Sequence, residues 1–160
     1  MEQVMFGAGC FWGVQYYFDQ VPGIVTTTAG YSGGTTENPT YEEVCTHTTG
    51  HAEVVLVEYE TDKVSFETLC KHFFRMHDPT QLNRQGPDVG DNYRSCIFYV
   101  TEAQKEAAEK VRAEVQKKTE KPIVTQIEPA GPFYEAEDYH QKFTEKTGRG
   151  MCHVAYEPIK

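Results

Sequence analysis

The sequence contains no Cys-x-x-Cys pair, and its five cysteines lie far apart, at positions 10, 45, 70, 96 and 152. Small secreted domains that depend on disulfides usually have dense, even-numbered cysteines, so structural disulfides are not expected here. The missing pair also removes the commonest sequence signals for zinc and for a two-cysteine redox motif. Chemistry at a single cysteine remains open.

Long apolar runs and an excess of basic residues are missing as well. No apolar run approaches the roughly 20 residues that a membrane helix needs, and Met1-Glu2-Gln3 lacks the basic and apolar regions of a signal peptide. The formal net charge of −9 disfavours binding to nucleic acid or to an anionic membrane, both of which require clustered Lys and Arg. We therefore expect a cytoplasmic protein.

A chain of 160 residues is long enough to bury a real core within one domain. Its apolar and charged fractions are ordinary for a globular protein. No internal repeat, low-complexity segment or linker divides the chain. We expect residues 1–160 to form a single domain and the protein to be a monomer.

Patterns of apolar and β-branched residues predict the secondary structure. Strands are expected near residues 4–6, 24–29, 51–60, 96–100 and 123–127, and helices near 14–18, 65–77, 101–121 and 135–146. Long polar loops are expected at 30–51 and 78–95. The first six elements run β-α-β-β-α-β, which is the order of the ferredoxin-like fold. We expect an α+β two-layer plait with a mixed sheet, extended by the later helix and strand and by an irregular C-terminal tail.

The segment Gly7 to Gly13, Gly-Ala-Gly-Cys-Phe-Trp-Gly, is the most informative stretch. It places Cys10 where a strand turns into a helix, and glycine tolerates the torsions of such a turn. A helix N-terminus favours a thiolate over a thiol, and Phe11 and Trp12 supply an apolar surface beside it. The pattern predicts a nucleophile for a small, mostly apolar substrate. The alternative is a buried cysteine that only packs.

Glu53 is the second informative residue, because it leads directly into the valine-rich strand expected at 51–60. A carboxyl group in that place loses hydration, which favours its protonated form and suits it to donating a proton. The alternative is an exposed carboxylate at the end of the strand.

Tyrosines and further cysteines complete the candidates. Tyr41 and Tyr93, in the two expected loops, can each donate a hydrogen bond while the ring lies in an apolar wall. The alternative is that each is an ordinary surface or packing residue.

Cys152 follows glycines whose conformational freedom would let its thiol reach a distant partner. The pattern predicts core positions for Cys70 and Cys96. Cys45 is expected to be packed, the alternative being a secondary thiol near the site.

Five motifs together resemble the A-type peptide methionine sulfoxide reductases. They occur in one order and at compatible spacing, from about residue 3 to Cys152, which makes the resemblance specific. The motifs are Gly9-Cys10-Phe11-Trp12-Gly13, Gly30-Tyr31-Ser32-Gly33-Gly34, Gly50-His51-Ala52-Glu53, Gln85-Gly86 with Asp88 and Tyr93-Arg94-Ser95, and Phe133-Tyr134-Glu135-Ala136-Glu137-Asp138-Tyr139-His140.

The resemblance implies a reaction and a role for each matching residue. Cys10 would attack the sulfur of methionine S-sulfoxide, free or in proteins, and Glu53 would protonate or hydrogen-bond its oxygen, helped by Tyr41 and Tyr93. Methionine would leave, Cys10 would remain as a sulfenic acid, and Cys152 would resolve it as a disulfide.

The resemblance also implies the binding residues and the reductant. Phe11 and Trp12 would hold the substrate methyl group, while Asp88 and His140 would position the substrate or support the pocket. The family uses no metal or bound cofactor; thioredoxin, or dithiothreitol in vitro, reduces the disulfide. The sequence departs from the family pattern at three positions, which puts the orientation of Asp88 and the packing of the tail in question: Pro87, Phe143 and Met151.

Two other classes of function stay open at this point. A cysteine hydrolase or acyltransferase would pair Cys10 with a histidine base, for which the candidates are His140, His51 and His77. A metal-binding scaffold lacks the usual paired ligand spacing. Its ligands would be Cys45, His47, His51, Cys152 and His153.

Overall fold

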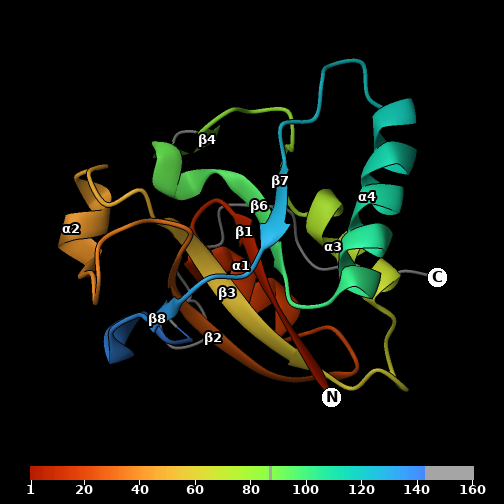
Figure 1. Cartoon of the computed structure of the whole chain (residues 1–160), viewed down its shortest axis with the longest axis horizontal. Coiled ribbons are helices and arrows are strands. Elements are labelled where there is room, and N and C mark those ends of the chain that lie inside the picture. Colours follow the sequence, from red (N-terminus) through yellow and green to blue (C-terminus); the bar gives the residue numbers. More distant parts are fainter. Residues whose placement is uncertain (87, 143–160) are drawn as a thin grey trace.

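The computed structural model describes residues 1–86 and 88–142, which form a six-stranded sheet with helices packed on it (Figure 1). The strand order across the sheet is β7-β6-β1-β3-β2-β8. Neighbouring strands are antiparallel except β6 and β7, which are parallel, so the sheet is mixed as predicted. The strands are β1 (Glu2–Ala8), β2 (Ile24–Ser32), β3 (Ala52–Tyr59), β6 (Ser95–Tyr99), β7 (Gln126–Pro129) and β8 (Phe133–Glu135).

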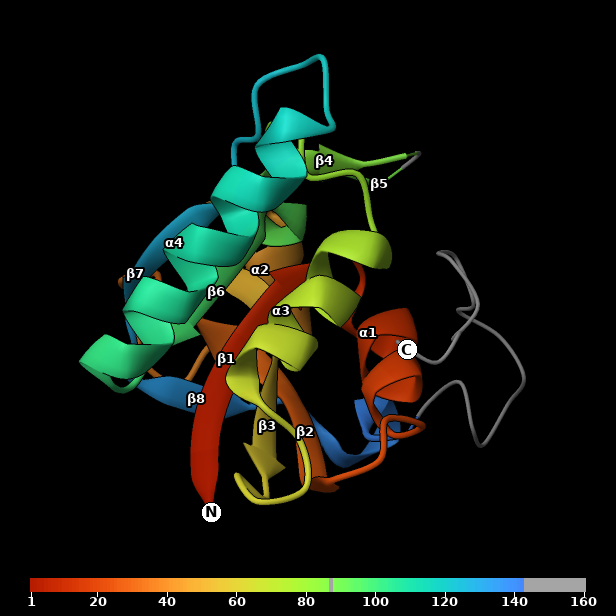
Figure 2. The same ribbon diagram turned by 90° about the vertical axis from the view of Figure 1, so that its right-hand side faces the viewer.

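Three of the helices lie on one face of this sheet. Figure 2 shows α1 and α3 side by side in front of the strands, with α4 beside α3. The order β1-α1-β2-β3-α3-β6 confirms the predicted ferredoxin-like core, and α4 with β7 extends it. The helices are α1 (Phe11–Phe18), α2 (Tyr41–Cys45), α3 (Phe66–Arg75) and α4 (Glu102–Lys117).

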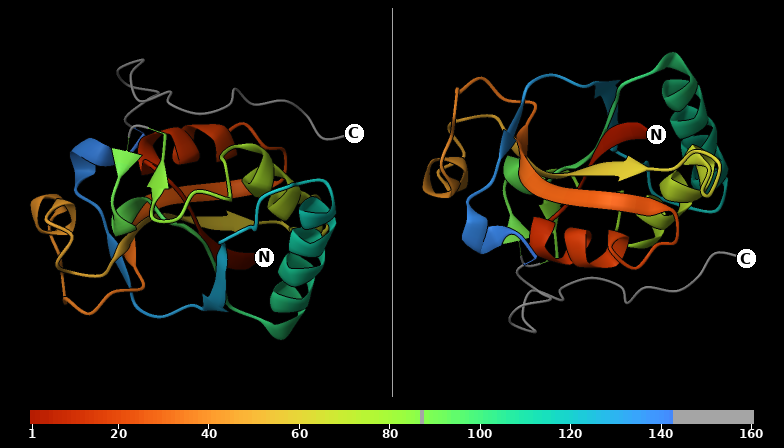
Figure 3. Two further views of the ribbon diagram at one scale, coloured as in Figure 1. Left: turned by 90° about the horizontal axis from the view of Figure 1, so that it is seen from above. Right: turned by 90° about the horizontal axis from the view of Figure 1, so that it is seen from below.

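The core has two parts because the central strands are apolar on both faces. On the helix-covered face, the ring of Phe6 stacks on Phe18 of α1 and Phe73 of α3, with centroids 4.9 and 5.3 Å apart. On the other face, a smaller cluster that includes Val54 and Phe98 packs against Phe133. Figure 3 shows the chain between β7 and β8 crossing this second face.

The two segments predicted as long loops contain short regular elements. Strand β2 continues to Ser32, and α2 begins at Tyr41 with a capping box between Thr40 and Glu43. In the second segment, β4 (Arg84–Gln85) pairs with β5 (Asp88–Val89), and the 3-10 turn η1 (Asp91–Tyr93) follows. The predicted strand at 123–127 is shifted, since β7 covers Gln126–Pro129.

The helix predicted at 135–146 is wrong for its described part. Residues Phe133–Glu135 form β8, which pairs with the free edge of β2, and a 3-10 turn, η2 (Asp138–His140), follows. Gly30 on β2 makes the pairing possible, because a Cβ there would lie 2.4 Å from the Phe133 ring. A strand edge that offers backbone hydrogen bonds overrides the helical preference of the local sequence.

Candidate active site

Cys10 lies between β1 and α1, at the predicted junction of strand and helix, and is the N-cap residue of α1. Gly9 enters this turn with φ of +94°, in the left-handed region that favours glycine. Gly7 is required for a different reason: a Cβ there would lie 2.5 Å from the Cys96 sulfur on the neighbouring strand. Cys10 itself is partly exposed, so it is not one of the packed core cysteines.

Glu53 is buried at the start of β3, with 1% of its surface exposed, so the alternative of an exposed carboxylate is wrong. Its Oε1 accepts a hydrogen bond of 3.2 Å from the backbone N–H of Phe11, the residue after Cys10. Its Oε2 accepts one of 3.2 Å from Nδ2 of Asn92. The pairing of β1 with β3 thus brings the carboxyl group next to the candidate nucleophile.

Tyr41 and Tyr93 both lie near the Glu53 carboxyl group. Tyr41 is the first residue of α2, and Tyr93 is the last residue of η1. Burial is the main cause that raises the pKa of each phenol, and the charge of Glu53 raises both further. Both phenols therefore keep their protons near neutral pH and can donate hydrogen bonds.

Aromatic rings form a wall beside Cys10. The ring of His140 lies 4.3 Å from that of Tyr41, 5.2 Å from that of Phe11 and 5.6 Å from that of Trp12, between centroids. The indole Nε1–H of Trp12 donates a hydrogen bond of 2.9 Å to Nδ1 of His140, which leaves the ring proton on Nε2. Burial lowers the pKa of His140, although the charge of Glu137 opposes this, so the ring is neutral.

Sequence reasoning missed two residues of this site. Glu137 accepts hydrogen bonds from the Tyr31 hydroxyl, at 3.0 Å, and from the backbone N–H of Tyr41, at 3.1 Å. The second is Asn92, the partner of Glu53. Glu137 lies within the last of the five motifs and Asn92 immediately precedes Tyr93, but neither has a residue type that signals a role without its contacts.

Asp88 and Cys45 lie at the edge of the site. Asp88 is partly exposed in β5, and its charge contributes to the raised pKa of Tyr93. Cys45 ends α2 and is partly exposed rather than packed in the core. Burial raises the pKa of its thiol, while a hydrogen bond with the Tyr41 side chain opposes this.

The structure tests the predicted core cysteines but not the residues predicted in the C-terminal tail. Cys70 and Cys96 are fully buried, as predicted. Pro87, Phe143, Met151, Cys152 and His153 lie outside the described residues, so the structure does not place the predicted resolving cysteine.

Two of the histidines proposed as a hydrolase base are engaged elsewhere. His51 uses Nδ1 to accept from the backbone N–H of Gly34, at 3.0 Å, and Nε2 to donate to the carbonyl of Thr36, at 2.6 Å. Both ring nitrogens of His77 are likewise hydrogen-bonded, to the Phe73 carbonyl and the Ser95 hydroxyl. Neither ring can therefore serve Cys10 as a base.

The described part of the chain contains neither a metal-binding cluster nor a membrane-spanning helix. Within residues 1–86 and 88–142, no three His, Cys, Asp or Glu side chains are grouped closely enough to bind a metal ion. No helix among them has the length and apolar character to cross a membrane.

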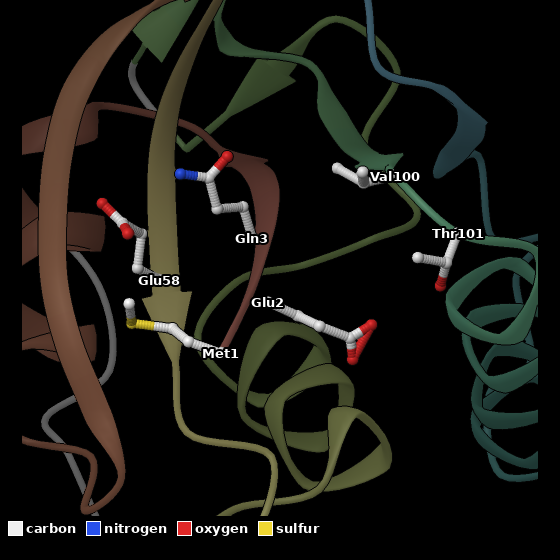
Figure 4. Close-up of a pocket in the computed structure, with 6 residues that line it drawn as sticks. All are labelled: Met1, Glu2, Gln3, Glu58, Val100 and Thr101. Carbon is white, nitrogen blue, oxygen red and sulfur yellow. The ribbon is translucent and has the colours of Figure 1, made fainter.

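A separate hollow of about 290 Å³ lies at the N-terminal end of β1 (Figure 4). Cys10 follows the other end of that strand, so the hollow is remote from the site. None of the predicted site residues lines it; the lining residues are Met1, Glu2, Gln3, Glu58, Val100 and Thr101.

Comparisons with known proteins agree on one family. The family model described as peptide methionine sulfoxide reductase matches residues 2–160. Peptide methionine sulfoxide reductase MsrA of Methanothermobacter thermautotrophicus is 54% identical over 155 residues, which cover 96% of this chain and 92% of the relative. Among solved structures, Mxr1 from Saccharomyces cerevisiae in reduced form superposes with a TM-score of 0.89 at 35% identity, covering 98% of this chain and 92% of that one. Mxr1 in complex with Trx2 superposes with a TM-score of 0.66 at 26% identity, covering 98% and 90%.

Proposed function

The chain belongs to the peptide methionine sulfoxide reductase family, and we propose that Cys10 and Glu53 perform the family reaction in it. The protein is a peptide-methionine (S)-S-oxide reductase, which reduces methionine S-sulfoxide to methionine with electrons from thiols. The observation that supports our assignment is the hydrogen bond between the Glu53 carboxyl group and the backbone N–H of Phe11, one residue from Cys10.

In the first step, the Cys10 sulfur attacks the sulfoxide sulfur while Glu53 gives a proton to the sulfoxide oxygen. Protonation is needed because the oxygen leaves the substrate sulfur poorly as an anion. The transient bond between the two sulfurs and the S–O bond of the substrate then break as the hydroxyl group passes to Cys10, which releases methionine and leaves Cys10 as a sulfenic acid. The substrate sulfur gains two electrons and Cys10 loses two, so the step is balanced.

Tyr41 and Tyr93 stabilise the developing charge on the sulfoxide oxygen in this proposal. Their raised pKa values keep both hydroxyl groups protonated, and both lie near Glu53, which must reach the same oxygen. Donors aimed at the place where charge develops lower the barrier more than donors to the resting substrate.

The aromatic wall binds the methyl group of the substrate. Trp12, which is partly exposed, supplies the apolar surface, and the fully buried Phe11 supports the wall from within the core. His140 fixes the indole of Trp12 through the 2.9 Å hydrogen bond. His140 therefore acts on substrate binding through Trp12. Asp88, on β5, supports the Tyr93 side of the pocket.

Recycling of Cys10 would use Cys152 and thioredoxin. The Cys152 thiol would displace water from the sulfenic acid and form a disulfide with Cys10, which thioredoxin would reduce. Sequence resemblance supports the choice of Cys152, and the complex of Mxr1 with Trx2 supports the choice of reductant. We further propose one domain over residues 1–160, working as a monomer in the cytoplasm without a bound metal or cofactor.

Replacement of the nucleophile tests the proposal directly. Cys10→Ser is expected to abolish the release of methionine from methionine S-sulfoxide with dithiothreitol as reductant, because a serine hydroxyl is neither ionised nor oxidisable under these conditions. Cys70→Ser, at a buried position remote from chemistry, is the matched control and should retain the activity. Near-normal turnover by Cys10→Ser would show that another residue attacks the sulfoxide.

Cys152→Ser separates reduction from recycling. The variant should release about one methionine per enzyme molecule and then stall with thioredoxin, since the sulfenic acid forms but is not resolved. Undiminished cycling with thioredoxin would move the resolving role to Cys45 or to an external thiol.

A further inference from the structure

Asn92 is a fully buried amide in contact with the catalytic acid. It lies in η1 immediately before Tyr93, and 0% of its surface is exposed. Its Nδ2 donates to Oε2 of Glu53 at 3.2 Å, while its Oδ1 has no hydrogen-bond partner within the described part of the chain. A buried carbonyl oxygen without a donor is unfavourable and therefore calls for an explanation.

A role for the other end of the amide supplies one, because Glu53 must change its protonation state in every turnover. Before the step its carboxylic acid has one O–H donor and a carbonyl oxygen that accepts, and after the step both oxygens accept. A fixed N–H donor can therefore bond Oε2 in both states. The single acid proton then stays available for the sulfoxide oxygen.

From this geometry we propose that Asn92 is a positioning residue for Glu53, hydrogen-bonded to its carboxyl group both before and after the proton is transferred. The N–H of Asn92 faces the carboxylate, as the structure shows. In the acid form the same N–H donates to Oε2 as the carbonyl oxygen of the group. The inference rests on the proposed role of Glu53 as the acid.

The surroundings of Asn92 hold its backbone and its amide in place. The turn is held by hydrogen bonds from the Tyr93 N–H to the Gly90 carbonyl, at 3.0 Å, and from Arg94 Nη1 to the Asp91 carbonyl, at 2.8 Å. A Cβ at Gly90 would lie 2.6 Å from Asn92 Oδ1, so glycine leaves the space that the outer amide atom occupies.

The amide also contacts Tyr93. The Asn92 side chain hydrogen-bonds with the Tyr93 phenol, and this contact opposes the rise in the pKa of Tyr93. A donor to the phenol oxygen has this effect, and a primary amide has two N–H donors. Asn92 can therefore donate to both Glu53 and Tyr93.

The pH dependence of the first turnover reports on this contact. Within the described residues, the charge of Glu53 raises the pKa of four groups from β2, α2 and η1, and burial is the largest cause for each. They are Tyr31, Tyr41, Cys45 and Tyr93. Cys10, the N-cap residue of α1, also lies beside Glu53, but a thiol loses reactivity on the acid side, where it is protonated. We therefore assign the loss of rate at alkaline pH, where a general acid has lost its proton, to Glu53.

The test compares Asn92→Leu with Asn92→Gln in single-turnover reduction of methionine S-sulfoxide between pH 5 and 10. Leucine removes the donor to the carboxylate, which disfavours the ionised form. The pH at which the rate falls on the alkaline side should rise by about one unit, and the maximal rate should fall roughly tenfold as the acid becomes a poorer donor. Glutamine keeps an amide and should keep the wild-type profile.

The matched control is Gln104→Leu, which removes another buried amide, at the start of α4 and remote from Cys10. It should lower the thermal midpoint without moving the pH profile. If Asn92→Leu does not fold, Asn92→Ala takes its place, because it imposes no steric demand. An alkaline limb that stays in place in the leucine or alanine variant would overturn the proposal, as would a glutamine variant that behaves like leucine.

Failure of this inference and failure of the proposed function give different results. If Glu53→Gln loses the first-turnover rate but Asn92→Leu leaves the profile unmoved, Glu53 is the acid and Asn92 has no part in its protonation. If Glu53→Gln keeps the rate, the proposed function itself fails.

Discussion

Replacing Glu53 by glutamine removes the acidic proton while keeping the size of the side chain. The structure predicts a small effect on folding, because the glutamine oxygen can accept from the Phe11 N–H and its amide can donate to Oδ1 of a rotated Asn92. If Asn92 did not rotate, two N–H groups would face each other. The unsatisfied donors would then cost about 1–3 kcal/mol, or roughly 2–4 °C per kcal/mol in the thermal midpoint of a domain this size.

The effect on the chemical step is expected to be much larger. A positioned general acid contributes typically 10²- to 10⁴-fold, which corresponds to about 3–5 kcal/mol in the activation barrier. The Glu53→Gln variant should therefore form methionine about 100-fold more slowly or worse in a rapid-quench single turnover without thioredoxin, so that recycling does not enter the measurement.

Glu58→Gln is the matched control for this experiment. Glu58 lies on the same strand, but it is only half-buried and accepts a hydrogen bond from Thr26, far from Cys10. It should keep the wild-type rate. A Glu53→Gln variant whose rate stays within about threefold of wild type would refute general acid catalysis by this residue, since such a loss is below the typical range.

Two further predictions concern groups outside the reacting pair. Glu137→Gln removes the charge that accepts from the backbone N–H of Tyr41, so a roughly tenfold lower kcat is expected in the wild-type background but no further loss in a Tyr41→Phe background. Replacement of the exposed Glu135 of β8, Glu135→Gln, is the control, and equal losses in both backgrounds would contradict coupling through Tyr41. Burial lowers the pKa of His72 to about 4, so the unfolded chain binds the proton more strongly. Stability to urea should be constant above about pH 6.5 and fall by roughly 2 kcal/mol at pH 5, whereas an equal fall in His72→Gln would assign the effect to other groups.

The local sequence was sufficient to predict those features that depend only on residues close to one another in the chain. The position of Cys10 at a strand–helix junction follows from an apolar run, two glycines and a helical pattern within a few residues. The burial of Cys70 follows from its place on the apolar face of an amphipathic helix. The ferredoxin-like order follows from the succession of such elements, because few topologies accommodate it.

Local patterns failed where a distant strand decided the conformation. The local pattern predicts a helix from Glu135, yet Phe133–Glu135 form β8 because β2 offers an unpaired edge and Gly30 leaves room for the Phe133 ring. No property of residues 133–135 alone contains that information, since the edge and the glycine lie about a hundred residues earlier in the chain.

The same distinction between local sequence and tertiary contacts applies to the chemistry of the site. The sequence by itself determined which side chains are available: a thiol at a helix start, a carboxyl group beside a valine-rich strand, and aromatic rings. Only the tertiary structure decided which of them meet, through contacts that span 42 residues between Phe11 and Glu53 and 128 between Trp12 and His140. Sheet pairing and core burial create these contacts. Asn92 and Glu137 consequently acquire their roles from partners that no local pattern names.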